Sequence, residues 1–365
     1  MTTTPIDPPD LADRPDAPDL VDLAGLFDDE TIPLLRRLGE RPRGAGAGGR
    51  PDPVDEETRA QVWAALTGLG ALAGARTPAA PATLAAHLAV ADLLGRALHQ
   101  SPYLDTIAAA DLLAGRGGPV EAIAEEGRTV ALALRERGTD RPGDPPPFRV
   151  DGATITATRD FVAFAADVDH LLVVGAGRAA LVAVDQPGVR VRRRDDVARG
   201  DLYLVELAGA AIDGDVLDVA DAFPAVLARA RLRHAAYLVG SARAAVRLAC
   251  DRLRGRNAFG EPLARSTALA HRLAALAADA EAARALVDTA VTSGVDARLG
   301  AQAALLAGDV ARRAAEEVVH LHGALGMTER CDAQLFYRRA AVDAQWYGTA
   351  TALRAELAAT LAARC

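Results

Sequence analysis

A regular stripe of small and aliphatic residues between positions 232 and 253 limits most strongly what this chain can fold into. The residues of the stripe recur three and four positions apart: Leu232, Ala235, Val239, Ala242, Val246, Ala249 and Leu253. This spacing places them on one face of an α-helix that packs into a bundle. A second stripe indicates a second helix: Leu269, Leu273, Leu276, Ala280, Ala283 and Val287. With a third helix expected over about 301–321 and a last one from about 348, the pattern predicts a four-helix bundle over residues 223–365.

Two other kinds of pattern precede this bundle. Residues 54–125 contain Ala and Leu at helical spacing and predict a helical domain. Residues 126–222 contain short β-branched runs separated by Gly, Pro and Asp, which is typical of antiparallel strands. Residues 1–53 are rich in proline and glycine and are expected to be disordered or flexible. The predicted fold is α+β and mostly α: an N-terminal helical domain, a middle antiparallel β domain and a C-terminal bundle.

Composition excludes several classes of function. The net charge of -8, with the arginines spread along the chain, argues against a nucleic-acid partner. All 41 basic residues are arginine, so a lysine Schiff base, and with it ordinary pyridoxal-phosphate chemistry, is excluded. The three cysteines lie far apart and indicate neither a disulfide framework nor a zinc site. Without a secretion signal or an apolar run of about 18 residues, we expect a cytoplasmic protein that does not enter a membrane.

Three motifs resemble those of the acyl-CoA dehydrogenase superfamily. RNAFGEPL at 256–263 is similar to the family's R-x-x-F-G-x-P-[IL], and HLHGALGMTERCDAQLFYRRA at 320–340 to its Q-x-x-G-G-x-G-[YF]-T segment. ITATRDFVAFAADVDHLLVV at 155–174 is similar to its strand pair. The resemblance covers about 55–362 and implies an FAD-containing oxidoreductase that acts on CH–CH groups of an acyl thioester carried by CoA or a carrier protein. It also implies a homodimer, a homotetramer, or a hetero-oligomer with a related subunit.

The resemblance assigns cofactor contacts to six residues: Arg256, Phe259, His320, Gly323, Gly326 and Thr349. Arg256 is a permanent cation that can meet the diphosphate of a neighbouring subunit's FAD. Glycines in the second motif allow close approach of the backbone, and His320 stands where the family usually has Gln. His320 and His322 point in different directions on a helix end, so we predict no metal site.

The segment QWYGTATALR at 345–354 occupies the place of the family's catalytic base. In many members an aromatic-Glu-Gly-Thr sequence precedes the last helix, and its Glu removes the α-proton of the substrate. Here Trp346 falls on the aromatic and Tyr347 on the Glu. The alternative position for a Glu, on the first bundle helix, is Ala230, and the basic residue beside it is Arg231. A phenol with a pKa near 10 is a better donor than base.

We therefore expect Tyr347 to be a catalytic acid or carbonyl anchor that faces the acyl cavity beside a flavin, with Trp346 and Arg231 on the substrate side. Other flavin-contacting positions are also changed, including Ala163, Thr267 and Ala324. FAD is thus expected to be weakly held or lost.

Three hypotheses remain open from the sequence. The chain is a dehydrogenase with FAD and an unrecognised base, a non-catalytic subunit of a mixed oligomer, or a scaffold for a non-redox reaction. The last would be a cyclisation or isomerisation of a polyketide-like thioester in secondary metabolism, with Tyr347 as the acid. Fold alone does not decide among them.

Overall fold

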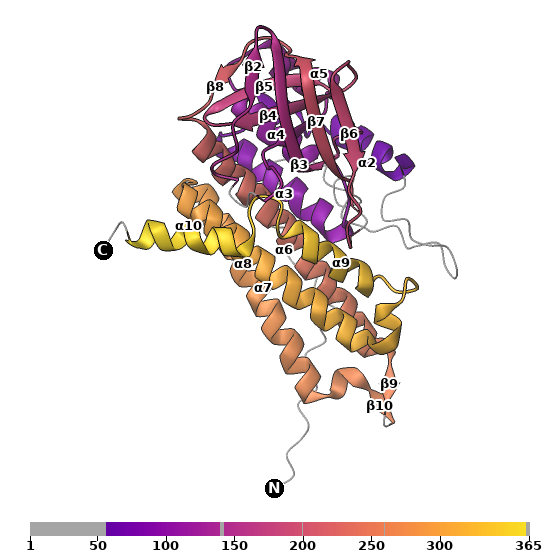
Figure 1. Cartoon of the computed structure of the whole chain (residues 1–365). Coiled ribbons are helices and arrows are strands. Elements are labelled where there is room, and N and C mark those ends of the chain that lie inside the picture. The colour runs from indigo at the N-terminus through magenta and orange to yellow at the C-terminus, as the bar shows by residue number, and fades with distance from the viewer. Residues whose placement is uncertain (1–55, 139–141, 199, 259, 363–365) are drawn as a thin grey trace.

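The structure is a computed structural model that describes residues 56–138, 142–198, 200–258 and 260–362. The segment 1–53, predicted to be flexible, lies outside the described residues. Helices cover one side of two stacked sheets, and a group of long helices extends away from them (Figure 1). The predicted α+β class is confirmed. None of the helices in the described part is long and apolar enough to cross a lipid bilayer.

The first part of the described chain is helical and packs against one sheet. Its elements are α2 (Glu56–Gly68), the 3-10 helix η2 (Ala73–Arg76), α3 (Pro81–Ala97), α4 (Tyr103–Leu112) and α5 (Gly118–Glu126). Every residue of α4 is buried. Its apolar sequence YLDTIAAADL explains this, because a helix that is hydrophobic all round is stable only inside the protein.

Two four-stranded sheets follow. The first has the order β1-β4-β5-β8, formed by β1 (Val130–Ala133), β4 (His170–Gly175), β5 (Arg178–Ala183) and β8 (Leu217–Asp218). The second has the order β2-β3-β7-β6, formed by β2 (Arg149–Asp151), β3 (Thr154–Ala163), β7 (Leu202–Ala211) and β6 (Val189–Arg193). The prediction of antiparallel strands needs one correction, since β1 pairs with β4 in parallel. The chain passes through the hairpin β2-β3 of the other sheet before β4 returns in the direction of β1.

The first sheet is buried on both faces. Along β4, Leu171 and Val173 belong to the core between the two sheets, whereas Leu172 and Val174 belong to the core shared with the helices. This follows from the alternation of side chains along a strand. Arg159 of β3 joins the sheets, because its buried guanidinium donates to the carbonyls of Ala133 (3.2 Å) and Val174 (3.2 Å).

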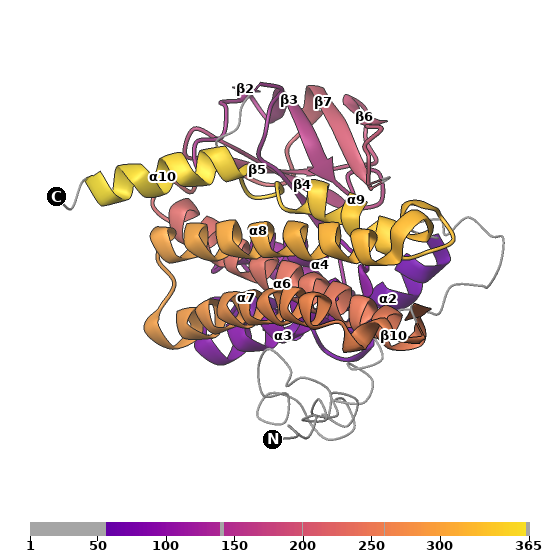
Figure 2. The same ribbon diagram turned by 90° about the horizontal axis from the view of Figure 1, so that it is seen from below.

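The third part consists of long helices that lie side by side (Figure 2). They are α6 (Phe223–Gly255), α7 (Thr267–Ser293) and α8 (Ala297–His322), followed by α9 (Ala333–Asp343) and α10 (Ala350–Ala362). A small hairpin of β9 (Asn257–Ala258) and β10 (Glu261–Pro262), then the 3-10 helix η3 (Leu263–Arg265), connects α6 to α7. A further 3-10 helix, η4 (Gly323–Met327), follows α8. α10 contacts α8 through Leu353, which packs on Ala301 and Ala304.

Two glycines allow α3 and α6 to cross with their backbones in contact. A Cβ atom at Gly95 of α3 would lie 1.9 Å from the carbonyl oxygen of Tyr237, and one at Gly240 of α6 would lie 2.1 Å from that of Asp92. Real Cβ atoms do not approach backbone so closely, so a methyl group at either position must push the helices apart.

We expect Gly240→Ala to lower the free energy of unfolding by about 1–3 kcal/mol, the usual cost of overpacking. Gly255→Ala, at the end of the same helix, is the control, because a Cβ there meets no atom within 4 Å. That substitution should be neutral or stabilising, since Ala favours helix over Gly. Urea denaturation of both variants measures the difference, and equal stabilities would contradict the close crossing.

Candidate active site

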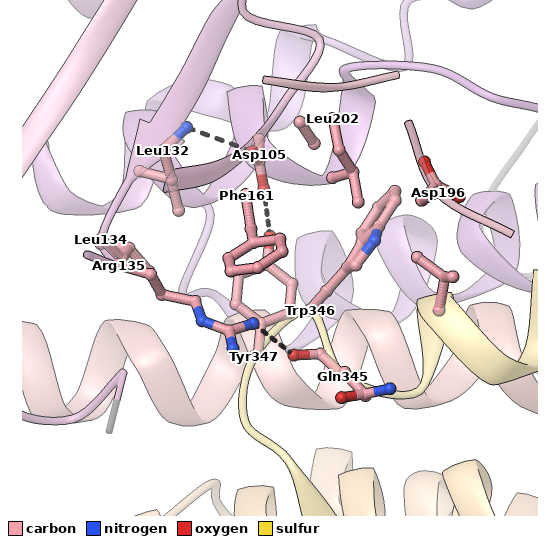
Figure 3. A pocket seen from close by; sticks show the side chains of 12 residues that line it. Asp105, Leu132, Leu134, Arg135, Phe161, Asp196, Leu202, Gln345, Trp346 and Tyr347 are labelled. Atoms are coloured by element: carbon pink, nitrogen blue, oxygen red, sulfur yellow. Dashed lines mark hydrogen bonds between the residues drawn. The ribbon is translucent and has the colours of Figure 1, made fainter. Parts of the chain in front are cut away.

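A cavity of about 180 Å³ lies where α4, the two sheets and the segment between α9 and α10 meet (Figure 3). Its walls are formed by Asp105, Leu132, Leu134, Arg135, Phe161, Ala163, Asp196, Leu202, Val342, Gln345, Trp346 and Tyr347. The Arg135 Nη1 donates to the carbonyl of Gln345 (3.0 Å) and so ties the segment after β1 to the segment before α10. Residues more than 200 positions apart thus form one site.

An ionisable pair, Asp105 and Tyr347, is buried in the wall of this cavity. The Tyr347 hydroxyl donates a hydrogen bond to Asp105 Oδ1, and the Leu132 backbone N–H donates to Asp105 Oδ2 (3.1 Å). Burial raises the pKa of Asp105 to about 6, although both hydrogen bonds act to lower it. Burial and the neighbouring Asp105 carboxylate raise the pKa of Tyr347 well above its usual value. At neutral pH the pair is therefore mainly a carboxylate that accepts from a protonated phenol.

Trp346 forms another wall as the last member of an aromatic stack. Its ring stacks on His234 at 5.3 Å and 20°, and His234 stacks on Tyr237 at 5.9 Å and 11°. Because its partner is the carbonyl of Asp343, the Nε2 of His234 carries the proton and donates (2.6 Å). Burial lowers the pKa of His234 to about 4, so the ring is neutral. The Trp346 Nε1 is buried without an acceptor among the described residues.

Arg231, which was predicted to contact the substrate, bonds to the segment that begins at Tyr347 and to α10. Its guanidinium makes two hydrogen bonds to Glu356 of α10 (2.7 and 2.8 Å), and its Nε donates to the carbonyl of Tyr347 (3.0 Å). It is buried and is not among the residues that line the cavity. Its bonds to the described residues hold the segment 347–356 in position and make it a structural tether, and its contact with a substrate stays a prediction.

Of the six predicted cofactor residues, the five that the structure describes are not among those that line the cavity. Arg256 and His320 are exposed, at the ends of α6 and α8, and Phe259 lies outside the described residues. Gly326 is buried where a Cβ would be 2.6 Å from the carbonyl of Val319. The Thr349 Oγ1 accepts from the N–H of Ala352 (3.2 Å) at the start of α10.

Gly323, the remaining one, is exposed at the start of η4. Arg256 follows Arg231 by 25 positions along α6, so roughly 40 Å separates the two. The structure therefore brings Trp346 and Tyr347 together in the cavity wall, whereas Arg256 lies far from it along α6.

Asp105 is the site residue that sequence reasoning missed. A signal was present, since Asp105 and Asp111 interrupt the otherwise apolar run YLDTIAAADLL, where a buried carboxylate must be either paired or functional. Its partner lies 242 residues later in the chain. Neither local spacing nor periodicity connects two residues so far apart.

The cavity wall fits the ring part of a flat aromatic cofactor such as FAD, but not a whole dinucleotide. Phe161 is 48% exposed and has a φ of 56°, a conformation rare for aromatic residues. It lies at an irregularity of β3 between Arg159 and Val162, with the Arg135 guanidinium 5.2 Å from its ring centroid. The unpartnered indole N–H of Trp346 suits a carbonyl acceptor of a ring. The cavity volume is below the roughly 300–1,000 Å³ of ordinary small-molecule pockets, so any remainder of a dinucleotide must lie outside it.

Comparison with known proteins finds a family match for the C-terminal part of the chain. Residues 221–362 match the family described as "Acyl-CoA dehydrogenase, C-terminal domain". The acyl-CoA dehydrogenase IpdE2 of Mycobacterium tuberculosis is 34% identical over 127 residues, which cover 33% of this chain and 38% of that protein. For three such curated relatives the matched segments span 34 to 44% of the relative's length.

Solved structures agree over almost the whole chain. A structure entitled as a Tcur3481–Tcur3483 steroid ACAD variant has a TM-score of 0.80 at 24% identity, covering 91% of this chain and 97% of that one. The ChsE4–ChsE5 complex from Mycobacterium tuberculosis has a TM-score of 0.76 at 23% identity, covering 93% and 96%. Residues 221–362 therefore belong to the acyl-CoA dehydrogenase C-terminal domain family, and the two stacked sheets and the N-terminal helices before them share the fold of these solved structures.

Proposed function

We propose that this protein is a flavoprotein that acts on an acyl thioester by α,β-dehydrogenation or closely related chemistry. The observation that carries the proposal is the position of the cavity. It lies between the sheets, α4 and the start of the last helix, and its wall holds an ionisable pair at the place where this family has its catalytic Glu. The family match of residues 221–362 supports the reaction class, and similar curated proteins bear the name acyl-CoA dehydrogenase.

The residues of the cavity divide into two roles under this proposal. Phe161 and Trp346 would bracket the ring of the cofactor, and bound FAD would supply the hydride acceptor. Asp105 and Tyr347 would face the carbon atoms of the thioester. Leu132, Leu134 and Leu202 exclude water from the same space, which strengthens every electrostatic interaction within it.

We infer that the FAD diphosphate lies between two subunits. Arg256 is exposed and makes no ion pair with the residues that the structure describes, and it lies roughly 40 Å along α6 from the tether at Arg231. One chain therefore cannot direct Arg256 and its own cavity at a single dinucleotide. The two similar structures are each named after two proteins, Tcur3481–Tcur3483 and ChsE4–ChsE5. These names support a partner that is either a second copy or a related subunit.

Arg256→Ala should lower the flavin content of the purified protein, because it removes a permanent cation from the proposed diphosphate site. We expect a loss of at least tenfold in FAD affinity, measured from the flavin absorbance after dialysis against known FAD concentrations. Arg254→Ala, two positions earlier, is the matched control, since Arg254 already pairs with Asp251 and should leave flavin unchanged. A variant that stays as yellow as the parent would place the diphosphate elsewhere.

The Asp105 carboxyl should reduce the stability of the fold at neutral pH. Its pKa is raised from 3.8 to about 6 on folding, so the native state holds this proton more tightly than the unfolded chain. Stability is then lost as the pH rises through about 4 to 6, by about 3 kcal/mol in all. A buried carboxyl kept at such a cost is typical of functional sites.

The stability of Asp105→Asn relative to the parent should therefore increase between pH 5 and pH 8, by about 1.4 kcal/mol. Comparing two pH values cancels the constant effect of exchanging the side chain. Denaturant titrations at both pH values measure the difference, and Asp215→Asn, at an exposed position of the loop between β7 and β8, is the control. A pH-independent difference would mean that Asp105 titrates normally in the folded protein.

A further inference from the structure

We propose that Asp105 is the base that removes the α-proton of the thioester, and that Tyr347 is a positioning residue which holds the carboxylate through its hydroxyl. This inference rests on the proposed function and specifies its proton acceptor. The carboxylate that other members of the family carry before the last helix would be supplied here from α4, on the opposite side of the cavity.

Geometry supports this assignment first. Tyr347 occupies the position of the missing Glu, and its side chain extends from there to Asp105, so the carboxylate lies one hydrogen bond beyond the phenol oxygen. Both side chains line the cavity (Figure 3). Asp105 Oδ1 accepts from Tyr347, and Oδ2 accepts from the N–H of Leu132. A carboxylate has about four acceptor positions, so each oxygen retains capacity to accept a proton.

Buried positive charge on α6 acts on Tyr347, the hydrogen-bond partner of Asp105. Arg233 of α6 is fully buried, and its positive charge acts to lower the pKa of Tyr347. Arg229 and Arg233 share one partner, Asp111, so this buried group carries an excess of positive charge. Arg135 and Asp196 are the other charged residues of the cavity wall. Among the described residues Asp105 forms no direct ion pair, so its carboxylate is held by the hydrogen bonds from Tyr347 and Leu132.

The chemistry balances as a simple proton transfer. The Cα–H bond of the thioester breaks, its electron pair moves into the thioester carbonyl to form an enolate, and the proton is taken by Asp105. A base with a pKa of about 6 is ionised at neutral pH and is close to the optimum for this task. In the absence of a hydride acceptor the step reverses. The α-hydrogen of a bound thioester should then exchange with solvent deuterium.

Deuterium exchange tests the inference independently of flavin reduction. The probe is octanoyl-pantetheine, the portion common to CoA and carrier-protein thioesters, and it is incubated in D2O with the full-length protein in the assembly it forms on purification. We expect the parent to exchange the α-hydrogen and Asp105→Asn to exchange it at least 100-fold more slowly, the lower range for loss of a general base. Asp215→Asn should exchange at the parental rate.

Tyr347→Phe separates positioning from catalysis. The Tyr347 hydrogen bond lowers the pKa of Asp105, so its removal should move the midpoint of the pH–rate profile to higher pH while exchange above the midpoint stays within tenfold of the parent. Loss of exchange at every pH in Tyr347→Phe would identify Tyr347 itself as the group that contacts the α-proton. That outcome would overturn the assignment.

Binding of the probe, measured by equilibrium dialysis, separates a failure of the proposed function from a failure of the role assigned to Asp105. A protein that does not bind octanoyl-pantetheine contradicts the proposed function. A protein that binds it but does not exchange the α-hydrogen, or whose Asp105→Asn variant exchanges it as fast as the parent, contradicts the role of Asp105 alone. Circular dichroism verifies that each variant is folded. If Asp105→Asn is not folded, the pH–rate profile of exchange by Tyr347→Phe is the deciding measurement. A midpoint that is unchanged from that of the parent would overturn the inference.

Discussion

The crossing of α3 and α6 at Gly95 and Gly240 is the contact on which the arrangement of this protein depends. Backbone meets backbone there, so the N-terminal helices lie as close to α6 as two helices can. α4 follows α3 directly and packs against α6 and β1. Its position then fixes Asp105 relative to the segment that α6 holds through Arg231. Gly95 and Gly240 therefore influence the distance between Asp105 and the segment before α10, although neither glycine lines the cavity.

The region around the cavity combines strong structural pairs with a few polar groups that are left incompletely satisfied. Arg339 and Asp343 form a buried ion pair, and the Tyr237 hydroxyl donates to the same Asp343 (3.3 Å). These bonds fix the end of α9 and hence the direction of the segment that follows. By contrast, the indole N–H of Trp346 has no acceptor among the described residues, and Asp105 is held as a carboxylate against the effect of burial. Buried polar groups that lack a partner or are held charged against burial are expected where a ligand binds and supplies the missing interaction.

The sequence was sufficient for the fold class and for much of the helical order. Stripes of Leu, Ala and Val locate helices because burial of one face is a local pattern. The parallel pairing of β1 with β4 could not be obtained in this way, since it depends on which sheet the intervening hairpin joins. For the site, alignment to a known motif indicated Tyr347 and Trp346, which line the cavity, and Arg231, which does not. A motif fixes a position in the chain, whereas the partner of an arginine depends on what packs around it, here Glu356 of α10.

The stack of Trp346, His234 and Tyr237 has a consequence for spectroscopy. The chain contains only two tryptophans, and the other, Trp63, lies on α2 with its indole bonded to the carbonyl of Gly127. Emission from Trp346 originates inside the cavity wall, next to a neutral imidazole and with an unpaired N–H. Any molecule that enters the cavity changes the polarity and the hydrogen bonding of that ring. With Trp63 replaced by phenylalanine, the protein would contain a single tryptophan, and its emission, excited at wavelengths that the five tyrosines do not absorb, reports on occupancy of the cavity without a label.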